Sequence, residues 1–243
     1  VETLRGAGAR WVGLAPPRIR KPGEEKIDRF LAGLAPDAML VRGLGALREG
    51  VGQPWLRVGD FSLNVVNRAS AAEVLARGLS AFTPAFDLDA TQLVALLRGP
   101  LGRHAEVVIH HPMPLFHMEH CVIAALLSEG RDHRDCGRPC ERHQLGLRDR
   151  AGMDHPVEAD VGCRNTVFHA RPQSGADLLS ALTRVGVARY RIELVREAPG
   201  QVERIVQAYR RLIAGEVEPR EVWRELGTEQ GYGIVRGSLR VLA

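Results

Sequence analysis

Short apolar or β-branched runs alternate with amphipathic helical segments along most of this chain. The runs are residues 11–15, 38–41, 55–58, 79–83, 106–111 and 189–195. Helices are predicted between them at residues 24–34, 70–77, 89–97, 174–185 and 199–214. We expect Ser70 to cap the second helix, with Glu73 completing a capping box, and Asp89 to cap the third. Alternation of this kind is typical of parallel βα units, so it restricts the chain to an α/β fold.

Two architectures accommodate parallel βα units, an open doubly wound sheet and a (β/α)8 barrel. No glycine-rich GxGxxG turn follows the first predicted strand, and polar residues follow several different strands, as they do at the mouth of a barrel. We therefore expect residues 1–243 to form one domain, a TIM-like barrel with a long cysteine-bearing loop at residues 128–156. Residues 145–148 and 157–161 are candidates for further strands. About six strands are visible without them, which leaves open whether the barrel is complete, distorted or truncated. The chain begins at Val1 instead of methionine, so we expect that part of the N-terminal half of the barrel is missing.

Composition excludes several classes of protein. Hydrophobic residues make up 45% and charged residues 26% of the chain, which indicates a folded globular protein and not a disordered one. No run of 18 apolar residues and no secretory signal is visible, so we expect a cytoplasmic location and no membrane contact. The net charge of +4 is modest and comes almost wholly from arginine, which suits phosphate groups but does not by itself identify an RNA partner.

All nine histidines and all four cysteines fall between His104 and His169. The cysteines form a C-x14-C-x3-C-x22-C series at Cys121, Cys136, Cys140 and Cys163. Cytosolic compartments keep thiols reduced, so ligands or redox groups are expected more than disulfides. The sequence therefore predicts one centre held by four thiolates within residues 119–165.

Several occupants of a four-thiolate site are compatible with the sequence. A zinc ribbon usually presents two C-x2-C turns, whereas this chain has one close pair, Cys136 and Cys140, and two distant partners. Irregular spacing is typical of an iron–sulfur cluster, which is reached from several elements. Gly137 and Pro139 would allow the close pair to turn tightly around such a body. Zinc and four buried thiols without a ligand remain the alternatives.

Three segments of this region carry a family resemblance. They are HHPMPLFHMEHCVIAALLSEG, DCGRPCERHQLGLRDRAG and PVEADVGCRNTVF. Together they resemble the collagenase-like peptidase family U32, and segments on both sides extend the resemblance over nearly the whole chain. The resemblance implies a barrel whose four cysteines hold a 4Fe–4S cluster. At its N-terminal end the chain departs from the family pattern, so substrate contacts from that part of the barrel are expected to be missing.

The resemblance implies an enzyme, and it leaves two classes of reaction open. Some members of the family act in oxygen-independent hydroxylation of a ubiquinone precursor or of RNA bases, and others carry the name of collagenase-type proteases. No HExxH or GxSxG motif is present, and the histidines of His117-Met-Glu-His120 are too close for the zinc-protease pattern. We therefore expect iron–sulfur-dependent modification of an RNA base or an aromatic small molecule. An endopeptidase for collagen-like or unstructured chains and a zinc-stabilised scaffold without activity are the alternatives. The electron-transfer partner, the substrate and the oligomeric state cannot be read from the sequence.

Polar residues after the third predicted strand are candidates for substrate binding. Asp60, Asn64 and Asn67 follow the strand that ends at Val58 and would lie at the mouth of a barrel. The simpler interpretation is that Asn64 and Asn67 cap turns.

Four other residues are candidates for the catalytic machinery. His110 and His111 end a strand, whose side chains alternate, and we select His111 as the one facing the site. Glu119 lies just before Cys121 and would tune the centre from behind its ligands. Arg191 and Glu193 share one face of a strand, so burial would require an ion pair or an anionic substrate. Arginines near the cysteines and in the C-terminal tail are candidates for RNA contacts: Arg131, Arg134, Arg138, Arg142, Arg236 and Arg240.

Overall fold

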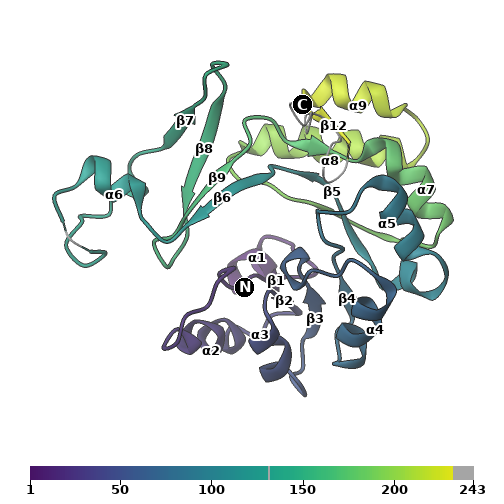
Figure 1. Ribbon diagram of the computed structural model, residues 1–243, viewed down its shortest axis with the longest axis horizontal. Coiled ribbons are helices and arrows are strands. Elements are labelled where there is room, and N and C mark those ends of the chain that lie inside the picture. Colours follow the sequence, from purple (N-terminus) through teal and green to yellow (C-terminus); the bar gives the residue numbers. More distant parts are fainter. Residues whose placement is uncertain (131, 232–243) are drawn as a thin grey trace, which may run out of the picture. The chain divides into compact units, whose positions relative to one another are not determined.

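The computed structural model describes residues 1–130 and 132–231 as a mixed α/β protein with a parallel sheet (Figure 1). Arg131, Arg236 and Arg240 lie outside the described residues. The described chain forms two compact units. The first comprises Val1–Ile109 and Gly175–Ile192, and the second comprises His110–Ser174 and Glu193–Gln230. The α/β class is confirmed, and the single domain over residues 1–243 stays a prediction.

The first unit contains the predicted parallel sheet. Its strands β1 (Gly13–Leu14), β2 (Ala38–Val41), β3 (Leu56–Gly59) and β4 (Ala81–Phe82) lie in sequence order and pair in parallel. Ala38, Val58 and Ala81 form a buried cluster on this sheet, against which Leu40 packs. Phe82 forms a parallel bridge to Ala105, the residue before β5 (Glu106–His111), and β11 (Arg189–Ile192) lies beside β5. The alternation of apolar runs and helices therefore gave the correct strand direction.

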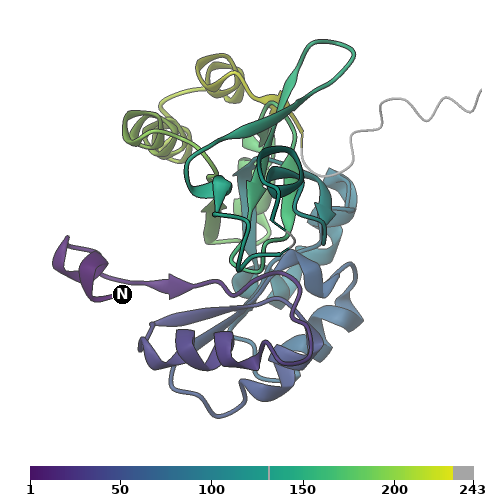
Figure 2. The ribbon, with the colours of Figure 1, turned by 90° about the vertical axis from the view of Figure 1, so that its left-hand side faces the viewer.

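Helices α2, α3 and α4 lie on the same side of this sheet in Figures 1 and 2. The helices of the unit are α1 (Glu2–Gly6), α2 (Glu25–Gly33), α3 (Leu44–Glu49), α4 (Arg68–Ala76), α5 (Ala90–Leu97) and α7 (Leu179–Arg184). Asp89 caps α5 as predicted, with Gln92 completing the capping box. The prediction for α4 was wrong, because Asn67 is the cap and Ser70 takes the third helical position. Asparagine caps as well as serine does, and the earlier cap adds helical hydrogen bonds.

The second unit contains an antiparallel sheet of four strands in the order β6-β9-β8-β7. These strands are β6 (Pro114–Met118), β7 (Leu145–Arg148), β8 (Asp154–Ala159) and β9 (Asn165–Phe168). The candidate strand at residues 145–148 is confirmed as β7, and the one at residues 157–161 overlaps β8. The expected loop at residues 128–156 was therefore only partly correct, because β7 and the start of β8 form a hairpin within it. Helix α6 (Val122–Leu127) follows β6 in sequence, and a short 3-10 turn, η3 (Pro139–Glu141), contains Cys140.

The rest of the second unit consists of two helices and short strands. Helices α8 (Pro199–Ile213) and α9 (Pro219–Leu226) contact each other. Strand β10 (Gln173–Ser174) is antiparallel to the end of β5, where His111 pairs with Gln173 and His110 with Ser174, and parallel to β12 (Glu229–Gln230). In the described part of the chain, none of the helices is both long enough and apolar enough to span a bilayer.

Candidate functional site

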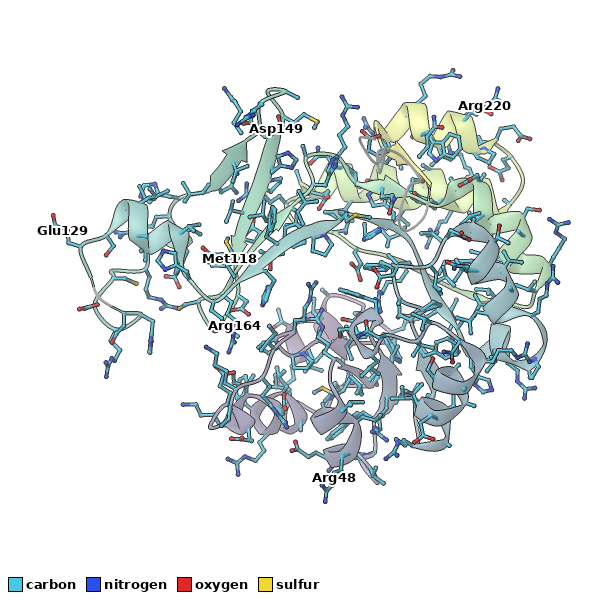
Figure 3. All side chains as sticks on the ribbon, in the orientation of Figure 1. Arg48, Met118, Glu129, Asp149, Arg164 and Arg220 are labelled. Atoms are coloured by element: carbon cyan, nitrogen blue, oxygen red, sulfur yellow. The ribbon has the colours of Figure 1, made fainter. Side chains whose placement is uncertain are left out.

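The four cysteines line one cavity of about 810 Å³ in the second unit. Cys121 follows β6, and Cys163 comes just before β9. Because Met118 of β6 pairs with Asn165 of β9, the two cysteines lie at the same end of the antiparallel sheet. Figure 3 labels Met118 and Arg164 at this end. Cys136 and Cys140 come from the segment after α6, and none of the four forms a disulfide.

The segment from Cys136 to Cys140 forms a tight turn. Gly137 and Arg138 both adopt positive φ angles, of 66° and 52°, and Pro139 begins the 3-10 turn that contains Cys140. Arg142 closes the turn by donating from Nη2 to the carbonyl of Gly137 at 2.9 Å. The structure thus agrees with the sequence-based interpretation that glycine and proline allow this turn.

A second tight turn presents Cys163, and Asp160 organises it. One carboxylate oxygen of Asp160 accepts the backbone N–H groups of Gly162 at 2.8 Å and of Arg164 at 2.9 Å. The carbonyl of Asp160 accepts the N–H of Cys163 at 3.0 Å. Cys163 itself has a φ of 62°, which costs a residue with a Cβ about 1–3 kcal/mol. A strained backbone at a predicted ligand, held by several hydrogen bonds, is typical of a functional position.

Arg164 is a buried cation beside Cys163 that was not predicted from the sequence. Its side chain is 1% exposed, and its Nε lies 3.2 Å from a carboxylate oxygen of Glu119. Its Nη1 also lies 4.0 Å from Asp160. Buried charges need partners, so this ion pair ties the Cys163 turn to the residues before Cys121. Glu119, which was predicted to stand behind the ligands, therefore contacts a neighbour of one ligand.

The sulfur of Cys121 accepts two N–H groups. The backbone N–H of Ala124 lies 3.5 Å away, and the side-chain Nδ2 of Asn165 lies 3.8 Å away. The amide oxygen of Asn165 accepts the N–H of Val122 at 2.8 Å. Asn165 is fully buried and was not predicted from the sequence. Its position two residues after Cys163 was the only available signal.

The four thiols of this cavity affect one another's ionisation. Burial raises the pKa of the Cys163 thiol, and the nearby Cys121, Cys136 and Cys140 raise it further. Removing protons from several of these thiols would therefore concentrate negative charge in one cavity. A cationic centre bound between the thiolates would relieve that repulsion.

The four thiols line one cavity, but they do not converge on one point. Zinc sites hold four ligands, with sulfurs about 2.3 Å from one point and hence about 3.8 Å from one another. Among residues 1–130 and 132–231, no three His, Cys, Asp or Glu side chains are grouped so that they could hold a metal ion. The occupant of this cavity, an iron–sulfur cluster or zinc, stays a prediction.

Two residues predicted from the sequence meet in the first unit. Asp60 is 1% exposed on its side chain and accepts from Nη2 of Arg191 and from Nε of Arg42, both at 2.9 Å. Arg191 also lies 2.9 Å from a carboxylate oxygen of Glu106. The expectation that a buried arginine on this strand needs an ion-pair partner agrees with the structure. Glu193 belongs to the second unit, where its backbone N–H donates to the carbonyl of His110 at 2.8 Å.

Asn64 and Asn67 occupy local structural positions. Asn64 ends the turn Phe61–Leu63 with a φ of 53°, a conformation that asparagine tolerates well. The side-chain oxygen of Asn67 accepts the N–H of Ser70 at 2.8 Å and caps α4. The simpler interpretation of these residues, that they stabilise turns and helix ends, accounts for both positions. Their predicted role in substrate binding stays a prediction.

His110 and His111 are both buried, at 0% and 2% exposed. His110 lies with Nδ1 at 3.3 Å from the hydroxyl of Tyr209, which is also 2.6 Å from Oγ of Ser174. Burial lowers the pKa of His110 to about 4. His111 instead lies with Nε2 at 3.2 Å from the side-chain oxygen of Gln173. The two rings therefore have different partners, as alternation along a strand requires, and a catalytic role for His111 stays a prediction.

Comparison with known proteins gives one match. The sequence model of peptidase family U32 matches residues 24–230, which is most of the chain. The match confirms the resemblance seen in the cysteine-containing segments. No curated protein and no solved structure matches this chain.

Proposed function

This chain belongs to peptidase family U32, and we propose that it is an iron–sulfur enzyme in which Cys121, Cys136, Cys140 and Cys163 hold one 4Fe–4S cluster. The observation that carries the proposal is the single cavity that all four thiols line. The family match adds the expectation of an enzyme. Zinc is the alternative occupant, and a scaffold held by zinc without catalytic activity is the corresponding alternative function.

The chain contributes position and electrostatics to this site. Two tight turns present three of the thiols, and N–H groups point at the sulfur of Cys121. The cation of Arg164 lies buried next to Cys163. When bound, a 4Fe–4S cluster would supply one-electron transfer. Hydroxylation of a C–H bond with the oxygen atom of water releases two electrons and two protons, so the cluster would pass the electrons one at a time to an external electron acceptor. We propose oxygen-independent hydroxylation of this kind or a related modification.

An RNA base or an aromatic small molecule is the substrate in this proposal. Support comes from a cavity of about 380 Å³ in the first unit, which apolar residues of β1 and β2 line together with Trp11, Tyr190, Glu106 and Arg191. Aromatic and apolar walls with a few polar groups are typical of small-molecule sites. Exposed arginines beside the cysteine cavity, Arg138 and Arg142, would suit an RNA backbone. We propose that the first unit forms part of a TIM-like barrel and that the protein acts in the cytoplasm.

The name of the family favours a second candidate, an endopeptidase that acts on collagen-like or unstructured polypeptides. The two functions differ in their dependence on the thiols. Cleavage of gelatin by a chain in which all four cysteines are serine would support a peptidase that is independent of any cluster. No cleavage of gelatin by the wild-type chain or by the chain with four serines would favour the iron–sulfur enzyme.

Anaerobic purification tests the cluster directly. We expect a brown protein that absorbs near about 400 nm and contains about four irons and four sulfides per chain. Each Cys→Ser variant should lower the iron content, whereas Val161→Ser, at an exposed position on the wall of the same cavity, should not. A colourless wild-type protein with one zinc per chain would refute the proposal. The substrate is tested by comparing modified nucleosides in RNA from cells with and without the gene.

A further inference from the structure

Asn165 joins the two segments that carry Cys121 and Cys163. It is the first residue of β9 and pairs with Met118 of β6, so it lies where the two strands approach the cysteine cavity. Its side chain is fully buried, and its contacts reach residues 43 and 44 positions earlier in the sequence. Since the sequence spacing between the two cysteines cannot fix their separation, a contact of this kind is needed to do so.

The amide of Asn165 has one orientation that satisfies its neighbours. The backbone N–H of Val122 can only donate, so the oxygen of the amide must face it, at 2.8 Å. The nitrogen of the amide then points at the sulfur of Cys121, at 3.8 Å. A sulfur acceptor is larger than oxygen, so its hydrogen bonds are longer. Both polar ends of the side chain are therefore used at the first turn of α6, which Cys121 caps and which is called the Cys121 turn below.

We propose that Asn165 is a positioning residue of the cysteine site, which holds the Cys121 turn against the Cys163 turn and donates an N–H group to the sulfur of Cys121. The proposal rests on the cluster proposed above. Hydrogen bonds to ligand sulfurs withdraw negative charge from the thiolate and therefore stabilise the reduced cluster, which carries one more electron. Asn165 would accordingly raise the reduction potential as well as fix the distance between two ligands.

The variant Asn165→Asp removes the hydrogen bond to the sulfur of Cys121 and keeps the one to Val122. Its carboxylate retains an acceptor for the N–H of Val122 but offers no N–H to the sulfur. At a fixed solution potential, we expect the ratio of reduced to oxidised cluster to fall about tenfold. This corresponds to a reduction potential lower by about 59 mV for one electron. The control is Thr166→Val, a change of similar volume at the next residue, whose hydroxyl contacts His117 instead. An unchanged or higher potential in Asn165→Asp would overturn the proposal.

Isotope labelling distinguishes the hydrogen bond from the added charge. The chain contains three asparagines, Asn64, Asn67 and Asn165. With ¹⁵N placed only in asparagine, pulsed electron paramagnetic resonance of the reduced cluster should detect a coupled side-chain nitrogen in the wild type and not in Asn165→Asp. A coupling that is absent from the wild type would refute the donation to sulfur.

A test on metal-free protein examines the positioning role of Asn165 separately from the proposed cluster. In a chain with Cys136→Ser and Cys140→Ser, a short bismaleimide should link Cys121 to Cys163. Adding Asn165→Leu, which removes both hydrogen bonds, should slow this link several-fold relative to the rate of modification by a monofunctional maleimide. Equal linking rates would overturn the positioning role even if iron binds. If the wild-type protein binds no iron but Asn165→Leu still slows the link, only the cluster is refuted.

Discussion

Replacing Gly162 by alanine should destabilise the turn that presents Cys163. A Cβ built on Gly162 lies 2.2 Å from Nη1 and 3.1 Å from Cζ of Arg164. Ordinary contact with a Cβ begins near 3.4 Å, so the guanidinium has to move by more than an ångström. It is 1% exposed and paired with Glu119, so it has little free space to enter. Insertion of a methyl group into a packed site costs about 1–3 kcal/mol. We expect a loss near the upper end of that range, because the displaced group is also charged.

Urea denaturation of the reduced, metal-free protein measures this loss as a shift of the midpoint at constant slope. Gly200→Ala is the matched control, since a Cβ at that position in α8 has no neighbour within 4 Å. Alanine favours a helix over glycine by up to about 1 kcal/mol, so the control should be neutral or slightly more stable. A Gly162→Ala chain as stable as the wild type would refute the close packing of Arg164 against this turn.

Two further predictions concern buried ionisable side chains away from the cysteines. Burial lowers the pKa of His110 from 6.5 to about 4. As the pH falls, the unfolded chain therefore protonates this histidine before the folded chain does. The free energy of unfolding should fall by about 3 kcal/mol between pH 6.5 and pH 4. His110→Gln should remove this part of the pH dependence in urea titrations, and an unchanged profile would show that another group causes it. Asp60→Asn removes the charge that Arg42 and Arg191 share, and we expect a loss of about 3–5 kcal/mol by denaturation, whereas a loss below 1 kcal/mol would mean that water reaches this ion pair.

The parallel strands were predictable because their sequence pattern is local. Residues 38–41 and 106–111 are strands with the bounds expected from the sequence, since strands that are mostly buried are rich in apolar residues, here AMLV and the VVI of EVVIHH. Strands β6 and β9 were missed. Their sequences, PLFHM and NTVF, mix polar and apolar residues, and their pairing depends on partners about 50 residues away. Helix α6 was missed because its six residues are all apolar and show no helical period.

The cysteines of the candidate site could be selected from the sequence, but the contacts around them could not. Cysteine is chemically distinctive, so four of them in order can be recognised in a sequence. Glu119 was selected from its place before Cys121, whereas its partner Arg164, 45 positions away, was missed. In the first unit, Asp60 and Arg191 were each selected, but their pairing across 131 positions was not predicted. Burial, and not residue type, turns these common side chains into parts of a site, and burial follows from tertiary structure.

Two kinds of interaction hold the four thiols, and they predict different defects. Turns within residues 136–142 and 160–164 close through hydrogen bonds of their own segments, so changes there should displace one ligand or the close pair. The contacts that Arg164 and Asn165 make with residues 119–122 instead link separate segments through the β6–β9 register. Changes to these contacts should leave each turn intact and alter the distance between ligands. The short spacing in the cysteine series thus reports local geometry, whereas the long spacings acquire their meaning only from the antiparallel sheet.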